Sequence, residues 1–173
     1  VDLGGRIQRS ARDKIQRYDD RSDQLYDLLW NSKTKTGLMP ASTRVSTAST
    51  INLLNDYGGT FSDEAIREVL GVGWMEKLRV LVAQRDTMSW ADMDALRQSV
   101  GRHTKGMKTD GNDPGLARDL YAAIMKDMEV AADQTSPLAK RAFKNARRYW
   151  RLGADVVENL EKEIIAKDPQ DLV

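Results

Sequence analysis

Apolar residues recur at steps of three and four near both ends of the chain, which is the pattern of one face of an α-helix. The first series predicts a helix from about Gly5 to Trp30 that no further Gly or Pro interrupts. The second series predicts a last helix from Pro137 to about Ala166. At the standard rise the two helices are about 40 and 45 Å long. The periodic positions are Ile7, Ala11, Ile15, Tyr18, Ser22, Leu25 and Leu29, and then Ala139, Ala142, Ala146, Tyr149, Gly153, Val156, Leu160 and Ile164.

Short amphipathic segments, separated by Gly, Pro and polar loop residues, fill the middle of the chain. Ser89 and Ser136 stand where N-cap residues belong, with Asp92 at the capping-box position and Pro137 at the first helical position. We expect Gly101 to end or weaken the helix that follows Ser89. The expected helices cover residues 47–57, 62–71, 74–85, 89–101 and 114–133. Since no stretch alternates apolar and polar residues over strand length, the pattern predicts an all-α fold.

Two helices of about 40 Å do not fit comfortably in a compact globule of 173 residues, whose radius of gyration is about 16 Å. We therefore expect one domain, an elongated helical bundle with two long terminal helices and several short helices between them. The connector after the first helix has few apolar residues, which predicts a mobile surface loop. The expected segments are a long helix over 1–32, the connector over 33–46, a short-helix region over 47–104, a loop over 105–113, a helical hairpin over 114–167 and a tail over 168–173.

The two ends of the chain favour a piece of a longer protein. The sequence starts at Val1 rather than at Met, so either an initiator was removed or the chain is a piece. The Gly4–Gly5 pair and the polar residues 167–171 have the character of frayed boundaries, which favours the piece.

Composition narrows the classes of function. The 27 Lys and Arg residues nearly balance 26 Asp and Glu residues, so a uniformly basic coat for nucleic acid is excluded. The absence of Cys excludes disulfides, thiolate zinc sites and Cys nucleophiles. No apolar run approaches 18 residues, so we expect no membrane-spanning segment.

The segment 101–109 is similar to a phosphate-binding loop, but its parts are out of register. Met107 separates Gly106 from Lys108, whereas the motif needs Gly and Lys side by side and a strand before the loop. The single histidine, His103, lies among basic residues, which disfavour a metal cation. We interpret the segment as a basic surface loop.

The acidic residues form no convincing catalytic or metal-binding set either. Asp92 and Asp94 are roughly 200° apart around a helix, so they cannot act as a carboxylate pair. Residues 110–114 resemble a calcium loop in composition, yet the required Gly and Glu are missing. Glu64 and Glu68 share a helix face, with nothing nearby to raise a pKa. We therefore expect no catalytic residue, cofactor, metal site or small-molecule substrate.

Charge is segregated along the last helix. Its first half carries bases without an acid, and its second half is mostly acidic, which opposes the helix dipole. Three interpretations stay open: pairing with acids of the same bundle, such as Asp13, Asp19, Asp20 and Asp23; self-assembly of base half against acid half; and binding of a nucleic-acid backbone. The candidate patch for a partner or nucleic acid is Lys140, Arg141, Lys144, Arg147, Arg148 and Arg151.

The apolar seam of the last helix predicts contact with another helix, from this chain or from a second copy. Gly153 in a helix interior costs about 1 kcal/mol relative to Ala, so a helix crossing at this position is expected. We interpret the four Trp residues, Trp30, Trp74, Trp90 and Trp150, as core anchors rather than as stacking platforms. The expected assembly seam is Ala142, Ala146, Tyr149, Gly153, Val156 and Leu160.

Three stretches of the second half carry a family resemblance. Residues 89–101 read SWADMDALRQSVG, residues 117–128 read ARDLYAAIMKDM, and residues 142–150 read AFKNARRYW. In this order they resemble a helical module of tailed-phage internal virion, DNA-ejection and tail structural proteins. Met125 and Met128 stand where that pattern has Leu and an acidic neighbour, and the first half of the chain resembles the module only loosely.

The resemblance implies a non-enzymatic virion component, internal and ejection-related or tail-associated, that is made in the host cytoplasm. Its implied partners are further copies of itself and other virion proteins, with DNA as a further candidate. It transfers no catalytic residue. The alternatives are a nucleic-acid-binding helical module that uses the basic stretch and, second, a segment of a muralytic enzyme.

Overall fold

The computed structural model describes residues 2–56, 67, 72–84, 87–106 and 114–173, and these residues form a helix-dominated fold. The all-α prediction is confirmed, apart from one small two-stranded sheet. In chain order the described elements are α1 (Leu3–Asp27), β1 (Arg44–Ser46), α2 (Ala48–Asp56), α4 (Val72–Gln84), β2 (Thr87–Ser89), α5 (Trp90–Gly106), α6 (Pro114–Thr135), α7 (Pro137–Leu160), the π-helical turn η1 (Glu161–Ile165) and the 3-10 helix η2 (Pro169–Leu172). The predicted helix over 62–71 lies outside the described residues, apart from position 67.

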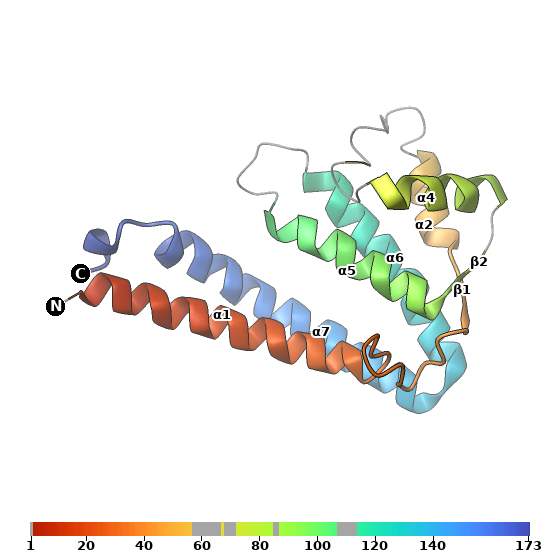
Figure 1. Cartoon of the computed structure of the whole chain (residues 1–173), viewed down its shortest axis with the longest axis horizontal. Coiled ribbons are helices and arrows are strands. Elements are labelled where there is room, and N and C mark those ends of the chain that lie inside the picture. Colours follow the sequence, from red (N-terminus) through yellow and green to blue (C-terminus); the bar gives the residue numbers. More distant parts are fainter. Residues whose placement is uncertain (1, 57–66, 68–71, 85–86, 107–113) are drawn as a thin grey trace.

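Helices α1 and α7 lie side by side and antiparallel, and both chain ends lie at the same end of this pair (Figure 1). Helices α2, α4, α5 and α6 and the small sheet gather at the opposite end, whereas η2 packs on α1 near the chain ends. We call residues 3–21 and 149–172 the arm, which projects away from that group of helices (Figure 1) and touches it where Trp150 stacks on Tyr121 of α6. Helices α2, α4, α5 and α6 and the small sheet, with the ends of α1 and α7 that pack on them, are called the head.

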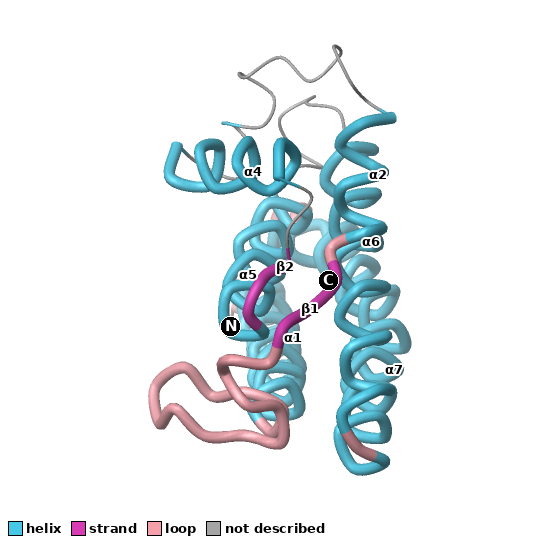
Figure 2. Tube along the Cα trace, turned by 90° about the vertical axis from the view of Figure 1, so that its right-hand side faces the viewer, coloured by secondary structure: helices cyan, strands magenta, loops and turns pink. Residues whose placement is uncertain are grey.

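The connector after α1 contains the first strand of the small sheet, which sequence analysis missed. β1 pairs antiparallel with β2, with Val45 opposite Met88 (Figure 2). Strands of three residues are too short to show an alternating pattern. Part of the predicted surface loop packs into the fold, because Met39 and Val45 are fully buried and the Trp90 amide donates to the Thr43 carbonyl at 2.8 Å. Residues 32–38 are exposed, and the mobility of the segment stays a prediction.

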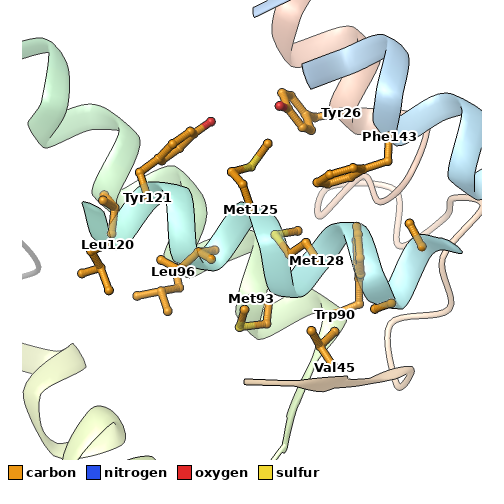
Figure 3. Close-up of a cluster of buried hydrophobic side chains, with 14 of the residues drawn as sticks. Tyr26, Val45, Trp90, Met93, Leu96, Leu120, Tyr121, Met125, Met128 and Phe143 are labelled. Atoms are coloured by element: carbon orange, nitrogen blue, oxygen red, sulfur yellow. The ribbon is translucent and has the colours of Figure 1, made fainter. Parts of the chain in front are cut away.

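Aromatic rings join three helices in the core of the head. Phe143 of α7 meets Tyr26 of α1 and Trp90 of α5 edge-on, with ring centroids 6.3 and 6.1 Å apart (Figure 3). Met93, Leu96, Leu120, Ile124 and Met128 complete this fully buried cluster. Of the four Trp residues, Trp30 and Trp90 are buried in the core, whereas Trp74 and Trp150 are half-buried against it.

Two carboxylates are buried in the head, one joining two helices and one paired within its own helix, and neither role was anticipated from the sequence. Asp127 of α6 accepts hydrogen bonds from the backbone amides of Ser49 and Thr50, each at 2.9 Å, so it caps the start of α2 from another helix. The Thr50 hydroxyl donates to the same carboxylate at 2.7 Å. Asp94 binds the buried Arg97 guanidinium at 3.0 Å.

The Arg97 guanidinium also lies over the ring of Tyr26, 3.9 Å from its centroid. Burial alone would lower the pKa of Arg97, but the adjacent Asp94 carboxylate raises this pKa above its usual value. Arg97 is therefore a fixed charge that is held by a carboxylate on one side and an aromatic face on the other.

The predicted N-caps are confirmed. The Ser136 hydroxyl accepts from the Ala139 amide at 3.0 Å, and the Ser89 hydroxyl accepts from the Asp92 amide at 3.2 Å. Gly101 was expected to end or weaken this helix; the end there is wrong, since α5 continues to Gly106 and the backbone at Gly101 stays helical. A weakening at Gly101 stays a prediction.

The description of the two ends as frayed is also wrong. The buried Gln8 side chain donates to the carbonyls of Ile164 and Lys167, at 3.3 and 2.7 Å. Gly4 is buried against the backbone of Pro169, where a Cβ would overlap the Pro169 carbonyl. The predicted tail therefore folds as η2 against the start of α1.

Candidate functional site

The arm is built around the crossing of α1 and α7 at Gly153. A Cβ at this position would overlap the ring of Tyr18, so only glycine leaves room for the ring where it lies. Tyr18 also stacks on Tyr149, with centroids 5.3 Å apart, and its hydroxyl donates to the Trp150 carbonyl. Burial, followed by the charge of Asp19, raises the pKa of the Tyr18 phenol.

The structure therefore places Gly153 at a helix crossing within this chain. Ala146 is fully buried, and Ala142, Tyr149, Gly153 and Leu160 are partly buried. Val156 differs from the rest of the predicted seam, because it remains 46% exposed. Assembly of several copies through these residues stays a prediction.

A groove of about 570 Å³ runs along one side of the arm between α1 and α7. Its walls are Lys14 and Arg17 from α1 and a row of apolar residues from α7, with Leu152 67% exposed. Leu152 and Val156 are one helical turn apart, so they form a continuous apolar strip beside the groove. The α7 residues of the groove are Tyr149, Leu152, Gly153, Val156, Val157 and Leu160.

A second cleft, of about 360 Å³, lies between α1, α6 and α7. Tyr121 of α6 stacks on Trp150 of α7 with centroids 5.3 Å apart, which gives the cleft an aromatic wall. Its charged lining residues have both signs: Asp19, Arg118, Arg147, Arg151, Glu158 and Glu161. Sequence analysis did not connect Arg118 and Tyr121 with this cleft, because its lining residues come from three different helices. The only hint of an aromatic site in the sequence was Trp150, which lies within the basic stretch of α7.

The basic stretch of α7 is mostly exposed. Arg147 is half-buried and forms an ion pair with Glu129 of α6. The stretch lines a shallow depression of about 770 Å³ together with Glu129 and Leu152. The exposed bases are Lys140, Arg141, Lys144, Arg148 and Arg151.

The antiparallel packing of α1 and α7 matches the charged halves of the two helices. Both helices are basic in their first half and acidic in their second half. Because they run in opposite directions, the basic half of α7 lies beside the acidic half of α1, and the reverse holds at the other end (Figure 1). Of the four acids named for this pairing, Asp19 lines the same cleft as Arg147 and Arg151. Pairing of the basic stretch with the acids of α1 stays a prediction.

The remaining candidate residues do not converge on a reactive site. Asp92 is exposed whereas Asp94 is buried with Arg97, so the two carboxylates do not meet. Residues 107–113, Glu64 and Glu68 lie outside the described residues, as does the His103 side chain. Within the described ranges, no three His, Asp or Glu side chains come together in a way that could hold a metal ion.

Comparison of the chain with protein-family models, with curated proteins and with solved structures finds no match. The resemblance to tailed-phage structural proteins therefore stays a prediction. In the part of the chain that the structure describes, no helix is apolar over a length that would cross a bilayer.

Proposed function

We propose that this chain is a non-enzymatic structural component of a phage virion, internal and ejection-related or tail-associated, that works by self-assembly and contacts with other virion proteins. The virion assignment rests on the resemblance of residues 89–101, 117–128 and 142–150. The assembly role rests on the uncovered face of the arm.

The observation that carries the assembly role is the change in burial along α7. Its buried residues, Ala139, Phe143 and Ala146, all lie in the first half. Beyond them the helix carries Leu152 and Val156, both large, apolar and exposed. A contiguous exposed apolar strip beside a groove marks an interaction surface more often than an isolated exposed residue does.

The virion assignment is tested by quantitative mass spectrometry of phage particles purified from the strain that encodes this chain. We expect the chain in fixed proportion to other virion proteins after a high-salt wash and nuclease treatment. Its absence from particles, despite expression in the cells, would contradict the assignment. Hydrolysis of peptidoglycan that disappears on a single carboxylate-to-amide change would contradict the non-enzymatic role.

Binding of a nucleic-acid backbone is a second candidate function, favoured by the five exposed bases of α7. The neighbouring acids of α1 and the acidic half of α7 weaken the positive potential that such binding needs. If DNA binds here, Arg148→Ala should lower the slope of log affinity against log salt by about one. Fluorescence anisotropy over a salt series measures this slope, and an unchanged slope excludes a phosphate contact by Arg148.

A further inference from the structure

We propose that a second copy of this chain docks on the exposed face of α7, with the two helices antiparallel and Leu152 on the two-fold axis. This inference rests on the proposed self-assembly and deepens it, because it names the partner, the surface and the register.

The docking face is a single line of exposed residues along α7 and η1. Successive members are three or four residues apart, so they lie on one side of the helix. Leu152 and Val156 are its apolar centre, with basic residues before them and an acid after them. The line is Leu138, Arg141, Asn145, Arg148, Leu152, Val156, Asn159 and Glu163.

This line is complementary to itself when one copy is reversed. With Leu152 facing Leu152 of the second copy, Arg141 faces Glu163 and Asn145 faces Asn159. Arg148 then lies beside Val156, which its aliphatic stem can cover. A two-fold axis makes each of these contacts twice, as in an isologous dimer. A parallel pair would instead set Arg141 and Arg148 against themselves.

Shape and charge favour a second copy over another partner. Leu152 and Val156 line the groove between α1 and α7, so a helix that docks over these two residues also covers one wall of the groove. In this register the charges that pair across the interface are Arg141 and Glu163, once on each side of the axis. Nucleic acid would meet the acidic half of α7 at this place. The exposed ion pair of Glu163 with Lys167, at 3.1 Å, contributes little and can exchange for Arg141.

The register can be tested by disulfide formation, because the chain contains no Cys. Leu152→Cys places two thiols at the axis, within the short range that a disulfide requires. Leu138→Cys is the matched control, since Leu138 lies on the same face of the same helix and is 61% exposed, against 67% for Leu152. We expect Leu152→Cys to form covalent dimers about a hundredfold faster under mild oxidation, because docking raises the effective thiol concentration.

A pair of variants tests the direction of the helices. Asn145→Cys and Asn159→Cys should each stay monomeric when oxidised alone, since like positions are about 21 Å apart along the axis. Mixed, they should form a heterodimer. Reduced proteins with unchanged melting temperatures show that the variants fold. Equal rates for Leu152→Cys and Leu138→Cys, or a chain that stays monomeric by light scattering, would overturn the docking. A dimer by light scattering without the Leu152 disulfide overturns this register alone and leaves the proposed self-assembly standing.

Discussion

The head and the arm use the same residue types in different ways. In the head, Trp90, Met93 and Phe143 are fully buried, and rings from three helices meet. In the arm, the buried residues are Gly4, Gln8 and Ala11 of α1, and the corresponding part of α7 buries none. The head thus has a core of its own, whereas the arm is a pair of helices with apolar side chains left at its surface.

The polar contacts of the head are also more buried than those of the arm. Among the described residues of the head, the buried charged groups have charged or hydrogen-bonding partners, as with Asp127 at the start of α2 and Asp94 on Arg97. The charges of the arm are largely exposed and arranged in blocks of one sign. The head is thus specified by the packing of its interior, and the arm by the partners that its surface can bind.

The largest difference should appear when one large apolar residue is shortened in each region. Phe143→Ala removes the ring that contacts Tyr26 and Trp90, and should lower the free energy of unfolding by about 3 to 5 kcal/mol. Leu152→Ala, measured at a concentration where the chain is monomeric, should change it by less than about 0.5 kcal/mol. Urea denaturation measures both, and equal losses would remove the distinction between head and arm.

The next largest loss of stability should follow from removal of the buried carboxylate that caps α2. Asp127→Ala leaves the amides of Ser49 and Thr50 without their acceptor and should cost about 1 to 3 kcal/mol. Asp133→Ala, an exposed acid on the same helix, is the control and should be nearly neutral. Hydrogen exchange at Ser49 and Thr50 should accelerate in the Asp127 variant alone; unchanged exchange would show that the cap does not hold α2.

Within the arm, the crossing at Gly153 should be the most sensitive point. Gly153→Leu forces the Tyr18 ring away and should cost about 1 to 3 kcal/mol through overpacking. The double variant Tyr18→Ala/Gly153→Leu should lose less stability than the sum of the two single changes, because the shortened Tyr18 no longer clashes with the new Leu, and the Leu fills the space that the ring leaves. Additive losses at Tyr18 and Gly153 would mean that α1 and α7 do not cross there.

Arg148→Ala should alter mainly the salt dependence of association.

The smallest effect concerns alkaline pH. Burial raises the pKa of Tyr18 and of Tyr26 above the ordinary value of 10.0. The unfolded chain then releases these protons first, so stability is full below pH 10 and falls as the pH rises toward the folded pKa. Tyr26→Phe should flatten this fall more than Tyr149→Phe, as followed by denaturation at several pH values. A fall of the same steepness in both variants would contradict the role of Tyr26.

The long helices and their caps could be predicted from sequence because they depend on local signals: apolar spacing, Ser89 and Ser136. The small sheet could not, because three-residue strands leave no pattern. Asp127 was missed because its partners are 77 and 78 residues away, and a buried acid looks like any helix-surface acid in the sequence. A glycine is unfavourable inside a helix, and this identified Gly153 as the site of a helix crossing. That Tyr18 is the residue packed against it was revealed only by the fold.

Sedimentation equilibrium tests whether the exposed face of α7 in the arm is an association surface. Val156→Lys and Val130→Lys form a matched pair, since the two valines are 46% and 45% exposed and only Val156 lies in the arm, where Arg148 of the second copy would repel the new charge. Wild type and Val130→Lys should approach twice the 19.5 kDa mass of one chain as concentration rises, while Val156→Lys stays at 19.5 kDa. A wild-type chain that remains a monomer, or two Lys variants that associate equally, would contradict an association surface on α7.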